Sequence, residues 1–482
     1  MVAAAHPDAV RIGVDILRRS GSAADAAIAV NAALGVCEPT ACGIGGDLFA
    51  MVWDGALHGL NAGGRAPAKI DAREIPLDGP ESWTVPGCVD GWFELHAKFG
   101  RLPMRDLLAP AIAMAREGVT IPPVIAEQWA RGVCDKPGFA ETFTPAAVFR
   151  NPRLADTYSL LVERNAFYHG PIAEEIVDFS RACGGFFTMQ DFEDHRSDWV
   201  PPISTTYRGV TVWELPPNTQ GATALQMLNM METFDLRAMG RDSADFWHAM
   251  VEVKKLAFED RATCLADITM PYARRRAGLI DMRRAAVRVA SGFEGGTTYI
   301  AVGDEGGMMV SLIQSNYTGF GSGYCVSGFG LQNRGALFNL DPSHPNCLVP
   351  RKRPFHTIIP AFATRDGEPW LAFGVMGGAF QPQGHAQILA NLLDFDMGLQ
   401  AAGDAPRFAH DGSSEPTGTR MREGGVLHLE SGVPERVRAE LARRGHRIEP
   451  GGYFGGYQAV ARTAAGYEGA TESRKDGIAL GY

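Results

Sequence analysis

Two threonines follow two glycines directly ahead of a run of residues typical of a buried strand. Residues 294–304 read EGGTTYIAVGD, with Gly296 and Thr297 at the junction. If the chain breaks between them, Thr297 becomes an N-terminal residue that carries a hydroxyl nucleophile and, in its α-amine, its own general base. An α-amine has a pKa of about 7.7–8.0, so part of it is free base at neutral pH. The stretch indicates either self-cleavage followed by threonine chemistry or a flexible turn before a strand.

The cut itself needs only the residues of this stretch. The hydroxyl of Thr297 would attack the carbonyl of Gly296, the acyl group would shift to oxygen, and water would hydrolyse the resulting ester. Glycine before the bond has no Cβ, so its carbonyl can adopt a geometry that a larger residue would resist. Such an enzyme requires no cofactor, no metal and no histidine, and the twelve histidines show no zinc-binding spacing.

The composition indicates an ordinary soluble globular protein. The 482 residues are 45% hydrophobic and 21% charged, with a net charge of −10. No basic block predicts a nucleic-acid partner, and no apolar run reaches the roughly 18 residues of a membrane helix. No secretory leader is recognised at the start of the sequence, so we expect a cytoplasmic protein, or a periplasmic one if a leader was removed.

Helical periodicity dominates the first part of the sequence, and strand patterns follow Thr297. Helices are expected over 7–19, 23–34, 242–266, 384–393 and 434–444. Strands are expected over 48–53, 298–302, 309–314, 357–364, 370–375, 457–462 and 477–480. Residues 319–353 are rich in glycine, proline and asparagine, and irregular chain of this length in a compact fold is usually functional.

Several long motifs occur in an order that resembles the γ-glutamyltransferase family, proenzymes of the N-terminal nucleophile hydrolase group. In chain order these motifs are HPDAVRIGVDILRRSGSAADAAIAVNAALGVCEPTACGIGGDLFA, VPGCVDGWFELHAKFG, LLAPAIAMAREG, PPNTQGATALQMLNM, EVKKLAFEDR, TTYIAVGDEGGMMVSLIQSNYTGFGSG, RKRPFHTIIPA and GVMGGAFQPQGHAQILANLLDF. They cover nearly the whole chain, and an ordered set is far more specific than any one motif. The resemblance favours the catalytic interpretation of Thr297.

The resemblance also implies roles for particular residues. Thr297 would be the nucleophile, released by cleavage after Gly296, and Gly377 and Gly378 of the segment GVMGG would form the oxyanion hole. Backbone amides can approach an oxyanion closely where no side chain intervenes. Arg65 of NAGGRAP would bind a substrate carboxylate, to which the two-pronged guanidinium is suited.

Two further positions lie on the strand after the nucleophile. If this strand is one residue shorter than in the family, the family's asparagine falls on Asn316. The threonine that steadies the nucleophile in the family, two residues earlier, then falls on Gln314, which can still donate and accept hydrogen bonds. The alternative for both is an ordinary polar residue near a sheet edge.

The sequence departs from the transpeptidases of the family where these bind the amino-acid end of the substrate. Their Ser-Ser pair is replaced by His356 and Thr357, and the position of their amine-binding aspartate falls near Leu337, just after Arg334. A buried ammonium without a carboxylate partner is costly. We therefore expect an acyl group that carries a carboxylate but no amine, faced by Arg65, Arg334 and His356. The alternative for His356 is a structural histidine bonded to the backbone.

The resemblance implies an α+β fold, a four-layer αββα sandwich of two mostly antiparallel sheets between helical layers. Residues 1–296 would form a large subunit and residues 297–482 a small one, which remain associated because both supply strands to one core; a homodimer is compatible with this. We expect a self-processing amidohydrolase or acyltransferase that cleaves a small-molecule amide through an acyl-threonine intermediate. The alternatives are a true γ-glutamyl transpeptidase or glutathione hydrolase, and an uncleaved family member that is not an enzyme.

Overall fold

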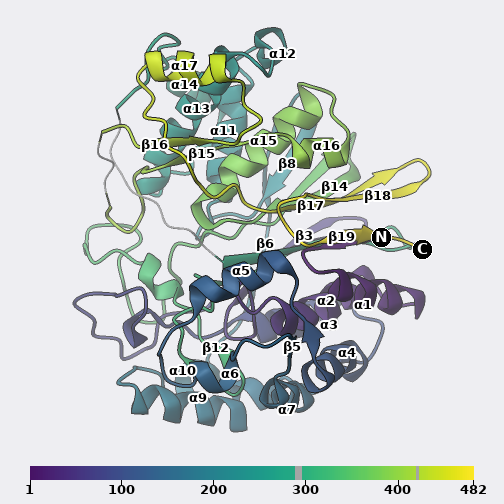
Figure 1. The fold of residues 1–482 in the computed structure, drawn as a ribbon. Coiled ribbons are helices and arrows are strands. Elements are labelled where there is room, and N and C mark those ends of the chain that lie inside the picture. The colour runs from purple at the N-terminus through teal and green to yellow at the C-terminus, as the bar shows by residue number, and fades with distance from the viewer. Residues whose placement is uncertain (288–295, 420–422) are drawn as a thin grey trace.

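Two β-sheets lie face to face between two layers of helices, as Figure 1 shows. The structure is a computed structural model that describes residues 1–287, 296–419 and 423–482. Glu294 and Gly295 of the stretch EGGTTYIAVGD lie outside the described residues, whereas Gly296 and Thr297 lie within them. The expected αββα sandwich is confirmed.

The first sheet has seven strands in the order β19-β1-β9-β10-β2-β3-β6, and all neighbours run antiparallel. Its strands are β1 (Val2–Ala4), β2 (Asp47–Trp53), β3 (Leu57–Ala62), β6 (Asp198–Val200), β9 (Gly296–Gly303), β10 (Met309–Tyr317) and β19 (Ile478–Leu480). Strand β9, which begins at the predicted cleavage site, lies between β1 and β10. Strands from before and after Thr297 are therefore interleaved in one sheet, with β1 between β19 and β9.

The second sheet has six antiparallel strands in the order β18-β17-β14-β13-β8-β7. They are β7 (Ile203–Tyr207), β8 (Val210–Glu214), β13 (Ala361–Arg365), β14 (Glu368–Val375), β17 (Tyr457–Thr463) and β18 (Gly466–Thr471). A buried apolar cluster joins the facing sheets, with Phe49, Tyr299 and Ile313 from the first sheet against Phe362 and Val460 from the second. The short pairs β4 (Val119–Thr120) with β5 (Val148–Phe149), β11 (Cys325–Val326) with β12 (Phe329–Gly330), and β15 (Phe408–Asp411) with β16 (Val426–Leu429) lie outside both sheets.

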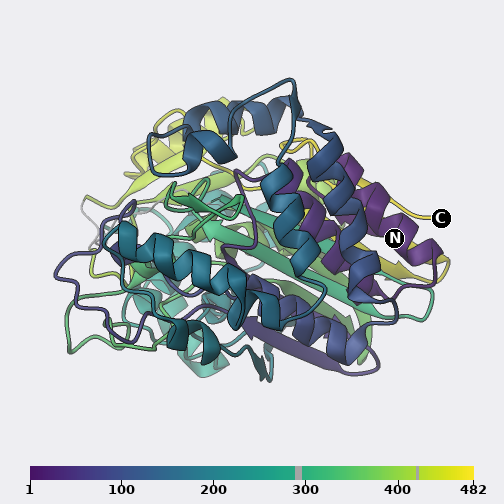
Figure 2. The same cartoon turned by 90° about the horizontal axis from the view of Figure 1, so that it is seen from below.

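Helices cover the outer face of each sheet (Figures 1 and 2). The layer on the seven-stranded sheet comprises α1 (Pro7–Arg18), α2 (Ala23–Cys37), α3 (Cys88–Phe99), α4 (Met104–Glu117), α5 (Pro123–Gly132), α6 (Phe139–Thr142), α7 (Pro152–Leu160), α8 (Asn165–Tyr168), α9 (Pro171–Ala182) and α10 (Met189–Glu193). The layer on the six-stranded sheet comprises α11 (Gly221–Met231), α12 (Leu236–Met239), α13 (Ala244–Ala262), α14 (Met270–Ala277), α15 (Gln381–Leu393), α16 (Leu399–Asp404) and α17 (Glu435–Arg443). Short 3-10 turns occur at Pro80–Ser82, Arg334–Leu337 and Gly378–Phe380.

Helix α2 is the central helix under the first sheet, and its residues explain why it starts where it does. The hydroxyl of Ser22 accepts a hydrogen bond from the amide of Asp25, and the carboxylate of Asp25 accepts one from the amide of Ser22, each at 3.0 Å. This capping box satisfies amides that the first helical turn leaves unpaired. All fifteen residues of α2 are buried, so the helix holds a fixed position beneath the strands.

The predicted elements agree with the observed ones except around Thr357. The strand expected over 357–364 begins only at Ala361, because Pro360 has no amide to donate and the amide of Ile359 bonds the side chain of Gln381 instead. Five strands of the two sheets were not predicted, namely β1, β3, β6, β7 and β18.

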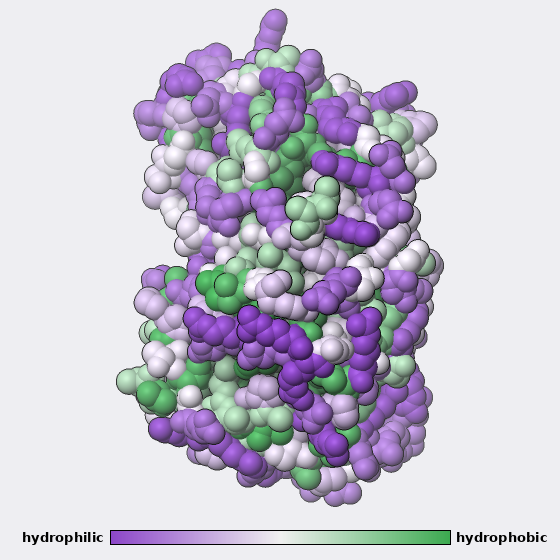
Figure 3. All heavy atoms as spheres, turned by 90° about the vertical axis from the view of Figure 1, so that its right-hand side faces the viewer, coloured by the Kyte–Doolittle hydropathy of each residue, from purple (hydrophilic) through white to green (hydrophobic). Residues whose placement is uncertain are grey.

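The two chain ends lie side by side, since β1 pairs with β19. On the face shown in Figure 3, hydrophilic side chains predominate and hydrophobic ones occur in small scattered patches. Among the described residues, no helix is both long and apolar enough to cross a bilayer.

Candidate active site

Thr297 is the second residue of β9 and its side chain is buried, with 2% of the residue exposed. Its hydroxyl oxygen lies 3.5 Å from the hydroxyl of Ser315 on the neighbouring strand β10. The hydroxyl of Ser315 in turn donates a hydrogen bond of 2.5 Å to the carbonyl oxygen of Gly296. The predicted nucleophile and the predicted scissile carbonyl therefore share a single hydroxyl neighbour.

Ser315 was missed in the sequence because β10 contains a bulge at this point. Gln314 pairs with Thr298 and Tyr317 pairs with Gly296, so two residues of β10, Ser315 and Asn316, lie opposite Thr297 alone. A bulge of this kind turns a side chain away from the regular alternation of a strand. A usable signal was present, because without the assumed shortening of the strand the family's threonine falls on Ser315.

Gln314 and Asn316, both predicted to bind substrate, contact the glycine-rich loop before β2. The side chain of Gln314 bonds both the amide and the carbonyl of Gly43, each at 2.8 Å. The side-chain nitrogen of Asn316 lies 3.4 Å from the carbonyl oxygen of Gly330. A Cβ on Gly46 would lie only 2.2 Å from the side-chain oxygen of Asn316. Both residues thus fix the backbone that lies against the start of β9 and the end of β10.

The residues on either side of Thr297 are held by groups from α2 and the loop that follows it. Thr298 donates a hydrogen bond of 3.0 Å to the carboxylate of Glu38, whose other oxygen lies 3.4 Å from the ammonium of Lys475. A Cβ on Gly296 would lie 2.7 Å from the carbonyl oxygen of Thr40, so the close approach of this loop requires glycine. Burial raises the pKa of Glu38.

A cavity of about 340 Å³ reaches Thr297 and Gly296, and Tyr453 and Lys475 are among its lining residues. Gly377 borders its wall, because a Cβ on Gly377 would lie 2.7 Å from the ring of Tyr453. Gly377 and Gly378 have φ of +126° and +56°, a region that L-residues rarely adopt. Among the described residues, neither amide donates a backbone hydrogen bond.

Gln220 connects the glycine turn to the segment that contains Thr357. Its side-chain nitrogen donates to the carbonyls of Gly378, at 2.8 Å, and of Thr357, at 2.5 Å. Its side-chain oxygen accepts a bond of 2.6 Å from Arg261, which is paired with Glu415. Gln220 lies in the motif PPNTQG, which carried no assigned role in the sequence.

Arg334 and Thr357, both predicted to contact substrate, lie together beside Ser315. The guanidinium of Arg334 donates to the hydroxyl of Thr357 at 2.8 Å and to the hydroxyl of Ser315 at 3.1 Å. It also lies over the ring of Tyr317, with its central carbon 4.7 Å from the ring centre. Burial lowers the pKa of Arg334 to about 10, so the group remains charged at neutral pH.

His356 belongs to a buried network around Asp47, the residue that pairs with Ser315 across β2 and β10. Its Nε2 lies 3.0 Å from one oxygen of Asp47, and its Nδ1 lies 3.4 Å from the amide of Ile358. The other oxygen of Asp47 accepts bonds from the amides of Gly64 and Gly87 and from the side chain of Gln332. Burial lowers the pKa of His356 to about 3. The shorter of these two contacts is to a carboxylate and the longer one to the backbone, so His356 is held mainly by Asp47.

Arg65 lies apart from the cavity that reaches Thr297. Its guanidinium forms an ion pair of 3.2 Å with Asp198, which Arg353 also contacts. Arg65 lines a separate cavity of about 290 Å³, together with Asp194 and His195. The structure therefore brings Arg334 and Thr357 to Ser315, the neighbour of Thr297. The substrate-binding roles of Arg65 and His356 stay predictions.

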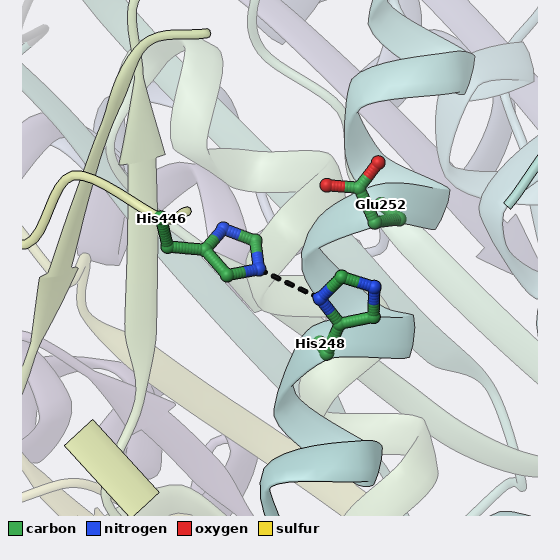
Figure 4. A group of neighbouring side chains, drawn as sticks. All are labelled: His248, Glu252 and His446. Atoms are coloured by element: carbon green, nitrogen blue, oxygen red, sulfur yellow. Dashed lines mark hydrogen bonds between the residues drawn. The ribbon is translucent and has the colours of Figure 1, made fainter. Parts of the chain in front are cut away.

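One cluster of side chains among the described residues has the composition of a metal site. Figure 4 shows His248 and Glu252 on successive turns of α13, with His446 approaching from the segment after α17. The facing nitrogens of the two imidazoles lie 2.8 Å apart, as in a hydrogen bond between neutral rings, and the ammonium of Lys255 pairs with Glu252 at 2.7 Å. The ammonium of Lys255 thus lies where a metal ion would contact Glu252. The hydrogen bond between the two histidines connects α13 to the segment after α17.

Two antiparallel sheets between helical layers, with a threonine at the start of a central strand, define the N-terminal nucleophile hydrolase class. A family model described as gamma-glutamyltranspeptidase matches residues 9–482, and the chain belongs to this family of hydrolases and acyl transferases. The membership confirms the resemblance inferred from the ordered motifs.

Three relatives illustrate the range of the family near this chain. The glutathione hydrolase-like YwrD proenzyme of Bacillus subtilis is 35% identical, and the alignment covers all of this chain and 98% of that protein. The oxamate amidohydrolase proenzyme of Klebsiella pneumoniae is 34% identical, with the same coverage. The crystal structure of cephalosporin acylase from Bacillus halodurans is 38% identical, superposes with a TM-score of 0.91, and is matched over all of this chain and 95% of its own.

Proposed function

We propose that this protein is a proenzyme that cleaves itself between Gly296 and Thr297 and then hydrolyses the amide of a small acyl group that carries a carboxylate. The observation that carries the proposal is the shared position of Thr297, Gly296 and Ser315. The hydroxyl of Thr297 adjoins the bond to be cut, and the hydroxyl of Ser315 polarises the carbonyl to be attacked.

In the self-cleavage reaction, the Thr297 oxygen bonds to the carbonyl carbon of Gly296 and the peptide nitrogen leaves as the new α-amine. Water then hydrolyses the ester, which gives a carboxylate at Gly296 and a free hydroxyl on Thr297. Removal of the peptide bond supplies the general base that the internal threonine lacks.

In the amide hydrolysis, the α-amine of Thr297 accepts the hydroxyl proton as the oxygen attacks the substrate carbonyl. The amides of Gly377 and Gly378 would stabilise the oxyanion, since their backbone conformation leaves them without a side chain in the way. The protonated amine passes the proton to the leaving nitrogen, and water then hydrolyses the acyl-threonine to the free acid.

The relatives support the substrate class. They include proteins named as an oxamate amidohydrolase and as acylases, all described as proenzymes, beside glutathione hydrolases. Asp341 is the acid nearest in sequence to the position of the family's amine-binding aspartate, and it bonds Ser343 at the protein surface. An acyl group with an α-amine therefore has less support than one without it.

The test combines intact mass spectrometry with an acyl panel. The proposal predicts two chains, starting at residue 1 and at Thr297, whose summed mass exceeds that of the precursor by one water. It also predicts faster release of aniline from a glutaryl anilide than from a γ-glutamyl anilide. A stable full-length chain would contradict self-cleavage, and a preference for the γ-glutamyl compound would indicate a true transpeptidase.

A further inference from the structure

Arg334 is a fully buried cation without a carboxylate partner among the described residues. Its exposed fraction is 0%, and its Nε has no hydrogen-bond partner there. The groups that its other two nitrogens contact, the hydroxyls of Thr357 and Ser315, are neutral. A buried charge whose direct hydrogen-bond partners are all neutral is unfavourable, so its retention calls for an explanation.

Two other buried arginines each form an ion pair with a glutamate. Arg407 is also 0% exposed and pairs with Glu472, and Arg261 is 3% exposed and pairs with Glu415. Asp47 contributes to the electrostatics of Arg334, but its oxygens are taken up by His356, Gln332 and backbone amides. Arg334 is therefore poised to receive an anion that the described residues do not supply.

We propose that Arg334 binds the carboxylate of the substrate's acyl group and sets the preference of the enzyme for short dicarboxylic acid monoamides. The inference rests on the proposed function, because it requires the cut that frees Thr297. In the uncut chain the hydroxyl of Ser315 donates a hydrogen bond to the carbonyl of Gly296 and accepts one from Arg334. Once the bond is cut, displacement of the Gly296 carbonyl would open this position to the substrate.

The geometry favours a short acyl chain. One hydroxyl group, that of Ser315, separates the guanidinium from Thr297, with contacts of 3.1 Å on one side and 3.5 Å on the other. A carboxylate in contact with Arg334 thus lies only a few bonds from a carbonyl in contact with Thr297, which suits acyl chains of about two to five carbons. The ring of Tyr317, which packs with Leu337 and Phe355, lies against the guanidinium of Arg334 and fixes its position.

The same arrangement disfavours an acyl group with an α-amine. An ammonium on the substrate would approach the Arg334 guanidinium, and two cations at close range in a buried site repel each other strongly. Arginine can instead hold a carboxylate through two parallel hydrogen bonds, for which its Nε and one terminal nitrogen are oriented.

The test compares kcat/KM for the monoamides of oxalic, succinic and glutaric acids with that for neutral amides of equal length. The wild-type enzyme is expected to prefer the acidic amides by about 100-fold or more, as expected for a charge-assisted buried contact. In Arg334→Met the ratio should fall to within about fivefold, and in Arg334→Lys it should be intermediate, because lysine keeps the charge but loses the two-pronged contact. Arg208→Met, at an arginine that pairs with Asp394, is the matched control and should leave the ratio unchanged. Arg65→Met tests the other arginine predicted to bind the carboxylate, and the ratio should survive there too.

A second measurement covers the case in which the Arg334 variants do not fold. Succinate should inhibit the wild-type enzyme competitively, and its dimethyl ester should not. An active wild-type enzyme with equal rates on acidic and neutral amides would overturn the assignment, as would loss of the ratio in Arg65→Met alone. A wild-type chain that stays uncut and hydrolyses no amide would instead overturn the proposed function, and the assignment with it.

Discussion

The hydroxyl of Ser315 donates to the carbonyl of Gly296 at 2.5 Å and accepts hydrogen bonds from the amide of Tyr317, at 2.8 Å, and from Arg334, at 3.1 Å. Because both donors point at the serine oxygen, its single proton is directed towards Gly296. A hydrogen bond to a carbonyl becomes stronger as negative charge develops on its oxygen. Ser315 is therefore placed to stabilise the intermediate of chain cleavage.

Replacing Ser315 by alanine should slow self-cleavage by about 100-fold, the usual effect of removing one oxyanion donor. The measurement is the rate at which the full-length band disappears on denaturing gels after expression. Ser311→Ala is the matched control, because Ser311 is equally buried on β10 but bonds Tyr299. Equal cleavage rates in the two variants would contradict the role of Ser315.

Thr297→Ala should abolish both cleavage and turnover, since no other group in the proposed mechanism supplies the nucleophile. Thr297→Ser keeps the hydroxyl and the future amine, so it should still cleave, at a rate reduced by lost packing of the methyl group. Intact mass spectrometry gives the cleavage, and an anilide assay gives the turnover. Full activity in Thr297→Ala would require another nucleophile.

Gly377→Ala should lower kcat by about 100-fold or more. The residue has φ of +126°, and the added Cβ would lie 2.7 Å from the ring of Tyr453, so the turn must shift and move its amides. Gly367→Ala is the control for the conformational cost alone, since Gly367 has φ of +82° with no atom near the added Cβ. If both variants lose stability equally but only Gly377→Ala loses kcat, the effect belongs to the site.

Gln220→Ala should reduce kcat more than it raises KM, because Gln220 fixes the carbonyls of Gly378 and Thr357 without facing the cavity that reaches Thr297. A loss of about 10-fold or more in kcat is expected from misplaced oxyanion amides. Steady-state kinetics on the cleaved enzyme, together with the melting temperature, separates this effect from unfolding. An unchanged kcat would show that the turn holds its geometry without Gln220.

Acidification should destabilise the folded protein through His356. The folded state holds this imidazole neutral, with a pKa of about 3 against an ordinary value of 6.5, so below pH 6.5 the unfolded chain gains a proton that the folded chain does not. The stability contributed above pH 6.5 is lost as the pH falls towards 3, by about 2 kcal/mol at pH 5 for one such group. Urea unfolding at pH 7.5 and pH 5 should show a smaller difference for His356→Gln than for the wild type or for His58→Gln.

Hydrophobic periodicity predicted the helices and strands that are regular along their length. It did not predict element boundaries or bulges that depend on side chains from other parts of the chain. The long helices and the strands at the centre of both sheets follow from apolar spacing, whereas several shorter strands do not. The bulge at Ser315 and Asn316 could not be read from the sequence alone, because it depends on how β10 pairs with β9. The start of β13 at Ala361 likewise depends on a hydrogen bond from Ile359 to the distant Gln381.

The neighbourhood of Thr297 was predictable in part. Arg334 and Thr357 lie beside Ser315, the neighbour of Thr297, and their contact with substrate stays a prediction. His356 and Arg65 could not be placed from sequence, since their partners Asp47 and Asp198 are 309 and 133 residues away along the chain. The local sequence around such a histidine is the same whether its ring faces the substrate or an internal carboxylate.

The position of β9 between β1 and β10 has a consequence for how the cut protein survives unfolding. Before cleavage, refolding is an event within a single chain and its rate does not depend on concentration. After cleavage, two separate polypeptides must first meet, and neither can complete the seven-stranded sheet by itself. The mature enzyme should therefore melt irreversibly in dilute solution, so that its working lifetime is governed by its rate of unfolding rather than by an equilibrium.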